Sequence, residues 1–126
     1  MKIEHAALWV RDLETMNAFY QEFFGARPGQ KYVNKTKGFS SYFLSFGSGA
    51  RLELMHNDAV PAGSGKPQTG YAHLAFSVGS KEEVDVFTAR LHGAGFTIVS
   101  GPRTTGDGYY ESCILDPEGN MVEITE

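Results

Sequence analysis

The sequence lacks several features that would place it in a specialised class of protein. Cys113 is the only cysteine, so no disulfide can form within the chain, and we expect a reducing cytoplasmic environment. No apolar stretch approaches the roughly 20 residues that a transmembrane helix needs. The first residues also lack the apolar segment and cleavage site of a signal peptide. We therefore expect a cytoplasmic protein with no membrane partner.

Basic charge is scarce as well. Lys and Arg total 11 against 15 Asp and Glu, which gives a formal net charge of -4, and only Lys31, Lys35 and Lys37 cluster. A surface that follows nucleic-acid phosphates usually needs a denser basic stripe, so we expect no nucleic-acid partner. With 126 residues, 41% hydrophobic and 13% aromatic, the chain is long enough to bury a core as a single domain.

The sequence does contain an internal repeat. Each half is expected to begin with a strand, continue with a helix that glycine ends, and finish with further strands. Asp12 and Ser80 are the expected N-caps of the two helices. The expected strands are 3–10, a weak one within 26–33, 39–46 and 50–56 in the first half, and 71–78, 96–100, 109–115 and 120–125 in the second. The expected apolar stripes of the helices are Leu13, Met16, Phe19, Tyr20 and Phe23, and Val84, Phe87 and Leu91.

The stretch between the halves has the composition of a linker. Glycine, proline and small polar residues dominate 58–70, and these residues favour turns over packed elements. We therefore expect a first module over 1–57 and a second over 71–126, both within one domain.

Each half also repeats a pair of polar residues. His5 opens the first strand of its half, and Glu53 lies in the last strand between two leucines. His73 and Glu123 take the same places in the second half, at nearly the same separation. The duplication therefore repeats a His…Glu pair together with the order of the elements.

Strand alternation indicates where these side chains point. Each glutamate has aliphatic neighbours on both sides, so these point to one face and the carboxylate to the other, which it shares with the histidine. A carboxylate that faces a sheet interior is costly unless it is paired. Two histidines and two glutamates around one cation would supply that pairing. Nitrogen and oxygen donors suit Zn, Ni, Fe, Co or Mn. The competing interpretation is that these are ordinary rim or exposed strand residues, and the repetition of the pair favours the metal site.

The repeated module with its two His…Glu pairs resembles the vicinal oxygen chelate superfamily, which includes glyoxalases, bleomycin-resistance proteins and dioxygenases. Residues 71–78 and 116–124 are similar to its glyoxalase I (lactoylglutathione lyase) branch. The resemblance implies an α+β fold in which two tandem βαβββ modules form an open, incompletely closed mixed β-barrel with helices outside. It also implies one divalent metal, Zn or Ni with Co, Mn or Fe as alternatives. In a homodimer, the metal would take His5 and Glu53 from one subunit and His73 and Glu123 from the other.

The implied reaction converts a hemithioacetal of methylglyoxal and a thiol into a lactoyl thioester, by proton transfer through a metal-stabilised ene-diolate. Glu123 is the expected base, with Glu53 as its counterpart on the opposite face. Trp9 stands where the family commonly has an arginine that meets the carboxylate of glutathione, whereas Asn57 matches a family asparagine. We expect a mobile loop over 101–108 that could cover the substrate, with Arg103 available for an anion.

Other activities of the superfamily remain as alternatives. They are a thiol transferase that inactivates an antibiotic, an epimerase, a dioxygenase, and a non-catalytic small-molecule-binding protein. Four ligand positions favour proton transfer over dioxygen chemistry, and a glutamate at position 53 favours a glyoxalase over the epimerase. Among the remaining polar residues, we expect His56 to face away from the site, His92 to lie at a helix end and Cys113 to pack in the core.

Overall fold

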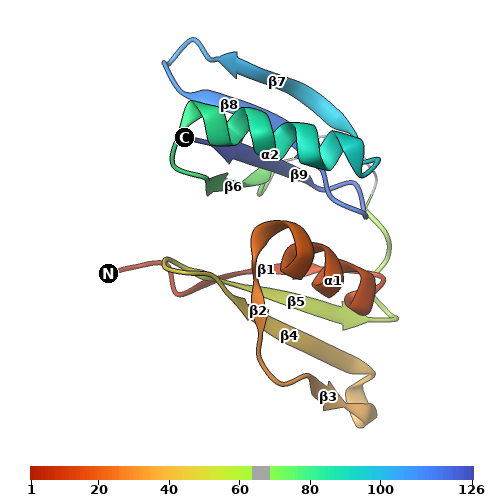
Figure 1. The fold of residues 1–126 in the computed structure, drawn as a ribbon. Coiled ribbons are helices and arrows are strands. Elements are labelled where there is room, and N and C mark those ends of the chain that lie inside the picture. Colours follow the sequence, from red (N-terminus) through yellow and green to blue (C-terminus); the bar gives the residue numbers. More distant parts are fainter. Residues whose placement is uncertain (64–68) are drawn as a thin grey trace. The chain divides into compact units, whose positions relative to one another are not determined.

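The computed structural model describes residues 1–63 and 69–126 of the chain (Figure 1). The chain divides into two compact units, Met1–Ser64 and Gly65–Glu126. Each unit combines one mixed β-sheet with one long helix, and neither sheet closes into a barrel. The expected α+β class is confirmed. The expected linker over 58–70 lies partly outside the described residues.

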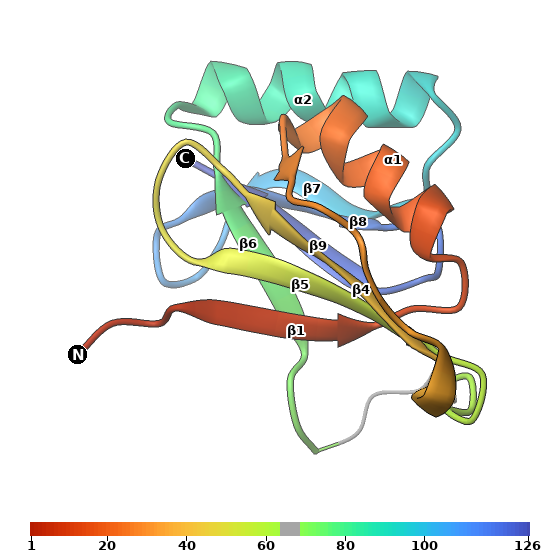
Figure 2. The same ribbon diagram turned by 90° about the horizontal axis from the view of Figure 1, so that it is seen from below.

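The sheet of the first unit has the strand order β1-β5-β4-β2, with β3 pairing to β4. The first strand runs parallel to β5, and the other pairs are antiparallel (Figure 2). The elements are β1 (His5–Trp9), α1 (Leu13–Phe24), β2 (Arg27–Pro28), β3 (Tyr32–Asn34), the short 3₁₀ helix η1 (Lys35–Lys37), β4 (Phe39–Ser45) and β5 (Arg51–Asn57). The expected weak strand within 26–33 is two short strands instead. Pro28 lies opposite Leu44 in the first of them, and the N–H of Gly29 still donates to the carbonyl of Phe43 at 2.8 Å, so the missing N–H of proline removes no bond to β4.

Local signals define helix α1 as expected. The Asp12 carboxylate accepts a hydrogen bond from the backbone N–H of Thr15 at 2.9 Å, and Gly25 ends the helix with a φ of 64°. The whole expected apolar stripe of α1 is buried, and the helix contacts β4 and β5. On these strands it covers leucines that are 0–3% exposed, namely Leu44, Leu52 and Leu54. The helix therefore lies on the aliphatic face of the sheet, which leaves the opposite face for the polar pair.

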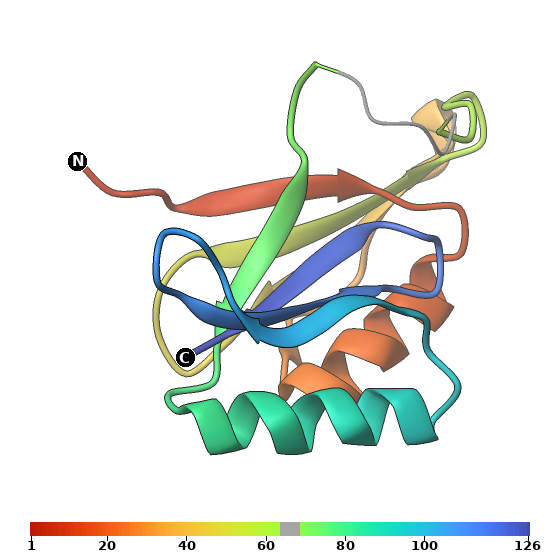
Figure 3. The same cartoon turned by 90° about the horizontal axis from the view of Figure 1, so that it is seen from above.

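The sheet of the second unit repeats this arrangement with the strand order β6-β9-β8-β7. Again the first strand, β6, runs parallel to the last, β9. Helix α2 extends along one face of this sheet, whose strands are green (β6) and blue (β7 to β9) in Figure 3, and contacts β7, β8 and β9. The elements are β6 (His73–Ser77), α2 (Lys81–Gly93), β7 (Ile98–Thr104), β8 (Tyr110–Leu115) and β9 (Met121–Thr125).

The caps of α2 also follow the sequence. The Ser80 hydroxyl accepts from the backbone N–H of Glu83 at 3.2 Å. Gly95 has a φ of 92°, and the N–H of Phe96 donates to the carbonyl of Leu91 at 3.1 Å. These bonds complete a Schellman motif, in which glycine takes the left-handed position. Gly95 therefore turns the chain out of the helix, whereas Gly93 still belongs to α2.

The buried face of α2 differs in one residue from the expected stripe. Val84 and Leu91 are fully buried as expected, but Phe87 is only half-buried and Thr88 is 5% exposed. The hydroxyl oxygens of Thr88 and Ser112 lie 2.6 Å apart in the core. This mutual hydrogen bond lets two polar side chains replace an aromatic one at this contact.

The expected loop over 101–108 was placed wrongly in part, because β7 continues to Thr104. The ladder between β7 and β8 contains register shifts around Gly101, which has a φ of 82°. Since β7 is an edge strand, it accommodates a bulge and Pro102 without breaking a ladder on its outer side. In the described part of the chain, no helix is long and apolar enough to cross a membrane.

Candidate metal centre

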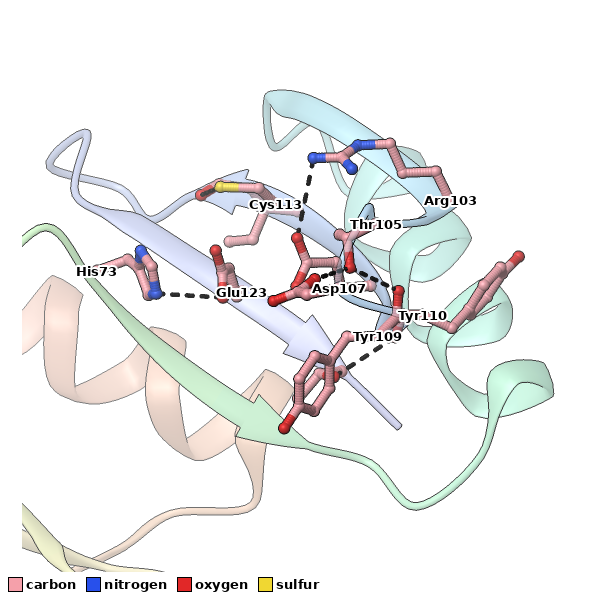
Figure 4. A network of polar contacts seen from close by, with 11 residues as sticks. His73, Arg103, Thr105, Asp107, Tyr109, Tyr110, Cys113 and Glu123 are labelled. Carbon is pink, nitrogen blue, oxygen red and sulfur yellow. Dashed lines mark hydrogen bonds and ion pairs between the residues drawn. The ribbon is translucent and has the colours of Figure 1, made fainter.

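The second unit brings His73 and Glu123 into direct contact. Across the parallel pair β6 and β9, Ala75 lies opposite Glu123, so His73, two residues earlier, shares its face. His73 Nε2 lies 3.1 Å from Glu123 Oε2, and the two side chains are 37% and 20% exposed. Figure 4 shows them pointing toward each other from the two strands. The structure thus brings together the second of the two His…Glu pairs expected from the sequence.

The first unit repeats the same register. Across the parallel pair β1 and β5, Ala7 lies opposite Glu53, and His5 again stands two residues earlier on that face. In both units, the residue opposite the glutamate is thus an alanine that follows the histidine by two positions. His5 and Glu53 share a face, but among the described residues the half-buried Glu53 carboxylate makes no hydrogen bond or ion pair.

The four residues fall into two pairs, one in each unit. Within residues 1–63 and 69–126, no group of three or more His, Cys, Asp or Glu side chains is arranged to hold a metal ion. The donor chemistry nevertheless fits a divalent transition metal, because each pair offers one imidazole and one carboxylate. The partly buried carboxylate of Glu53 also forms no ion pair among the described residues, and a bound cation would supply one.

His5 is held by neighbours that sequence reasoning missed. Its Nδ1 donates to Glu4 Oε2 at 2.5 Å, and Arg51 donates to the other oxygen of the same carboxylate. The hydrogen bond from His5, followed by that from Arg51, holds the pKa of Glu4 below its usual range. The available signal was the carboxylate directly before the histidine. The arginine lies opposite His5 through the β1–β5 register, which the sequence alone does not show.

A thiol stands beside the second pair. Cys113 on β8 lies opposite Glu123 and is 4% exposed. Burial raises the pKa of the Cys113 thiol, and the charges of Glu123 and Glu111 raise it further. It is buried, as expected for a packing residue. Its place next to Glu123 could not be seen in the sequence, because it depends on the register of β8 with β9.

The three expected substrate-binding residues have different surroundings. Trp9 shares the face of His5, is 47% exposed, and makes an edge-to-face contact with Phe39 at 6.1 Å between ring centroids. The Asn57 side chain donates to the carbonyl of Lys37 at 3.0 Å and accepts from the N–H of Ala59 at 2.9 Å. Asn57 therefore fixes the loops around the end of β5.

Arg103, the third of these residues, lies on β7 opposite Glu111 rather than in a mobile loop. Its Nη2 atom is 3.9 Å from Glu111 Oε1, and the arginine side chain is 52% exposed (Figure 4). At that distance the ion pair engages the guanidinium only loosely, so most of its five donors are not committed to Glu111. Arg103 lies on the same face of the sheet as Glu123. Glu111 and Cys113 are two residues apart and share a face of β8; Arg103 lies opposite Glu111, and Glu123 lies opposite Cys113.

The remaining histidines lie elsewhere, as expected. His56 lies three residues after Glu53 on β5, so strand alternation puts it on the opposite face of the sheet. Its Nδ1 donates to the carbonyl of Val10 at 2.9 Å. His92 lies in the last turn of α2.

Taken by fold and site alone, the chain is an α+β protein of two repeated strand–helix–strand units, each of which carries a His…Glu pair on the sheet face that the helix leaves open. Comparison with known proteins defines the family. The model of the Glyoxalase/Bleomycin resistance protein/Dioxygenase superfamily matches residues 2–124. The chain belongs to this superfamily.

Individual relatives lie in its glyoxalase branch. The lactoylglutathione lyase of Haemophilus influenzae is 29% identical over all of this chain and 93% of its own length. That of Schizosaccharomyces pombe is 27% identical over 98% of this chain, which spans 46% of the longer relative. A glyoxalase family protein from Enterococcus faecalis superposes with a TM-score of 0.81 at 28% identity, over 99% of this chain and 97% of its own.

Proposed function

We propose that the chain is a metal-dependent enzyme of the glyoxalase I type, which converts the hemithioacetal of methylglyoxal and a thiol into a lactoyl thioester. The observation that carries this proposal is the repeated register, with Ala7 opposite Glu53 and Ala75 opposite Glu123, which gives both units the same His…Glu arrangement. Relatives named lactoylglutathione lyases support the choice of reaction within the superfamily.

The proposed metal ligands are His5, Glu53, His73 and Glu123, and the proposed metal is Zn or Ni, with Co, Mn or Fe as alternatives. Two imidazoles and two carboxylates without a thiolate suit these ions. When bound, the ion supplies Lewis-acid polarisation of the substrate oxygens. The contact between His73 and Glu123 supports the proposal because it brings a nitrogen and an oxygen donor within 3.1 Å of each other.

We assign the proton transfer to the carboxylates of the chain. Glu123 removes the proton from the carbon that bears the hydroxyl and the sulfur, and returns it to the neighbouring carbon of the former ketone. A positioned carboxylate of this kind typically contributes about 10²–10⁴-fold to the rate. Glu53 is assigned the corresponding proton transfer on the opposite face of the substrate. Glu123 is 20% exposed, so it is shielded from most of the solvent while it remains accessible to a small molecule.

The site is proposed to form between two subunits of a homodimer, with His5 and Glu53 from one and His73 and Glu123 of the partner subunit. The proposal rests on the resemblance to glyoxalase I, and the division of the chain into two units that carry one pair each is compatible with it. A cytoplasmic location is also proposed, because a chain with a single cysteine can form no internal disulfide and suits a reducing environment.

The test is an activity assay of metal-reconstituted protein. The apoprotein is loaded with Zn or Ni and mixed with methylglyoxal and one of several thiols, glutathione among them, while thioester formation is followed. We expect turnover with at least one thiol and none without metal. Bound metal with no turnover for any thiol would favour the other superfamily activities, namely a thiol transferase, an epimerase, a dioxygenase or a binding protein.

A further inference from the structure

The hydrogen bond between Glu4 and His5 fixes which nitrogen of the imidazole carries the proton. An ionised carboxylate can only accept, so the 2.5 Å contact to Glu4 Oε2 requires the proton on His5 Nδ1. In the neutral ring, Nε2 then holds the lone pair that a metal needs. Ligating histidines usually show this division, with one nitrogen on the metal and the other donating to a carboxylate or carbonyl.

Glu4 is itself held in place by Arg51. Nε and Nη2 of Arg51 lie 2.8 Å and 2.5 Å from Glu4 Oε1, so one carboxylate oxygen serves the arginine and the other serves His5. Arg51 lies directly opposite His5 across the parallel strands β1 and β5. The guanidinium therefore reaches the carboxylate from the neighbouring strand and restricts the directions from which Glu4 can meet the imidazole.

A single aromatic ring supports both hydrogen-bond partners of Glu4. The Arg51 guanidinium stands 4.3 Å above the centre of the Phe43 ring, and the His5 ring meets the same ring edge-on at 5.3 Å and 83°. Phe43 lies opposite Glu53 in the antiparallel pair β4 and β5, so it belongs to the face of the proposed site. The imidazole is thus fixed by packing from one direction and by a hydrogen bond from another.

The second unit lacks this arrangement altogether. The residue before His73 is Ala72, and the residue opposite His73 is Met121. The carboxylate and the arginine are therefore both present in one copy of the module and both missing from the other. His73 instead meets Glu123 through Nε2, the same nitrogen that Glu4 leaves available on His5.

We propose that Glu4 and Arg51 are positioning residues, which hold His5 in the Nδ1–H tautomer and aim its Nε2 at the metal. This inference rests on the proposed function in that it takes His5 to be a ligand. The side chains of Glu4 and Arg51 are 55% and 42% exposed, and exposed ion pairs add little to folding stability. Their removal should therefore change the behaviour of His5 while leaving the fold intact.

The first arm of the test uses metal-free protein. Long-range ¹H–¹⁵N NMR distinguishes the two imidazole tautomers and is applied to the wild type, Glu4→Leu, Glu4→Gln and Arg51→Met. We expect the Nδ1–H form of His5 in the wild type and a shift toward Nε2–H in Glu4→Leu. Glu4→Gln should keep the wild-type tautomer, because its amide oxygen still accepts the hydrogen bond, and Arg51→Met should give an intermediate population.

The second arm measures the affinity for Zn by competition with a chelator. Glu4→Leu should weaken Zn binding by about 10–100-fold, the range typical of a lost partner of a ligating histidine, and Glu4→Gln should recover part of it. The matched control is Glu14→Leu, since Glu14 makes an equally exposed ion pair with Lys31 in the same unit at 2.6 Å. The control should retain both the wild-type tautomer and the wild-type affinity.

An unchanged His5 tautomer together with unchanged Zn affinity in Glu4→Leu would overturn the inference, and so would an equal loss in Glu14→Leu. These readouts do not depend on turnover. If Glu4→Leu behaves as expected but the loaded wild type forms no thioester, the proposed reaction fails and the positioning role stands. If thioester forms and Glu4→Leu matches the wild type in both arms, the positioning role alone fails.

Discussion

His73 Nε2 lies 3.1 Å from Glu123 Oε2 across two parallel strands that are far apart in the sequence. The contact joins the first and last strands of the second unit on the face that α2 does not cover. In the first unit, the same register places His5 and Glu53 on the equivalent face. A duplicated module therefore presents two copies of one donor pair, and the proposed function depends on those copies acting together.

Replacing Glu123 by Gln tests its role as the base. The amide keeps the size and one donor oxygen of the carboxylate but cannot accept the proton, so we expect kcat to fall by about 10²–10⁴-fold. Steady-state thioester formation by protein reconstituted with Zn or Ni measures this, with metal content determined in parallel. Metal should remain bound, with weakened affinity. A kcat close to that of the wild type would refute the assignment of the base.

Replacing Trp9 by Arg tests which thiol the site prefers. Trp9 is half-exposed on the face of His5, at the position where glyoxalase I commonly has an arginine for the glutathione carboxylate. A new charge-assisted hydrogen bond should raise kcat/KM for the glutathione adduct by about tenfold relative to the adduct of an uncharged thiol. Trp9→Phe is the control and should leave that ratio unchanged. A ratio that Trp9→Arg does not move would argue that this position does not meet the thiol.

Mixing two inactive variants tests whether the site is shared between subunits. His5→Ala damages the pair of the first unit, and His73→Ala damages that of the second. In a mixed dimer with shared sites, one site receives both substitutions and the other receives neither. After random subunit exchange, about a quarter of the wild-type activity should return. Each variant alone serves as the control, and failure of the mixture to exceed them would place each site within a single chain.

Gly101→Ala tests the bulge that shapes β7. Gly101 has a φ of 82°, and a Cβ there would approach the carbonyl oxygen of Glu111 to 2.5 Å. We expect a loss of about 1–3 kcal/mol in the free energy of unfolding, measured with urea. Gly106→Ala is the matched control, because nothing lies within 4 Å of a Cβ at that turn. Equal stability of the two variants would contradict the account of this strand.

Much of this fold follows from signals that are local in sequence. The repeated strand–helix order and the Asp12 cap depend on spacing within a few residues, and the structure reproduces them. The same holds for the alternation that turns each glutamate away from its aliphatic neighbours. The positions of Cys113 and Arg51 beside the pairs depend on which residues face each other across separate strands. Sequence spacing does not encode that register, because turns and bulges set it.

The extension of β7 through Thr104 is a second feature that the sequence did not predict. Gly101 and Pro102 are typical of a loop, and their composition favours one. The edge position of β7 and the register shift let the strand continue through them. Similarly, Thr88 replaces Phe87 on the buried face of α2 because Ser112 on β8 offers it a hydrogen bond.

The most direct test of the central claim is a Zn titration of the apoprotein and of four single variants, His5→Ala, Glu53→Ala, His73→Ala and Glu123→Ala. We expect one tightly bound ion per wild-type chain and an affinity at least about tenfold weaker in every variant, because each unit supplies half of the donors. Wild-type affinity in both variants of either pair would show that this pair does not hold the metal, and would contradict the account.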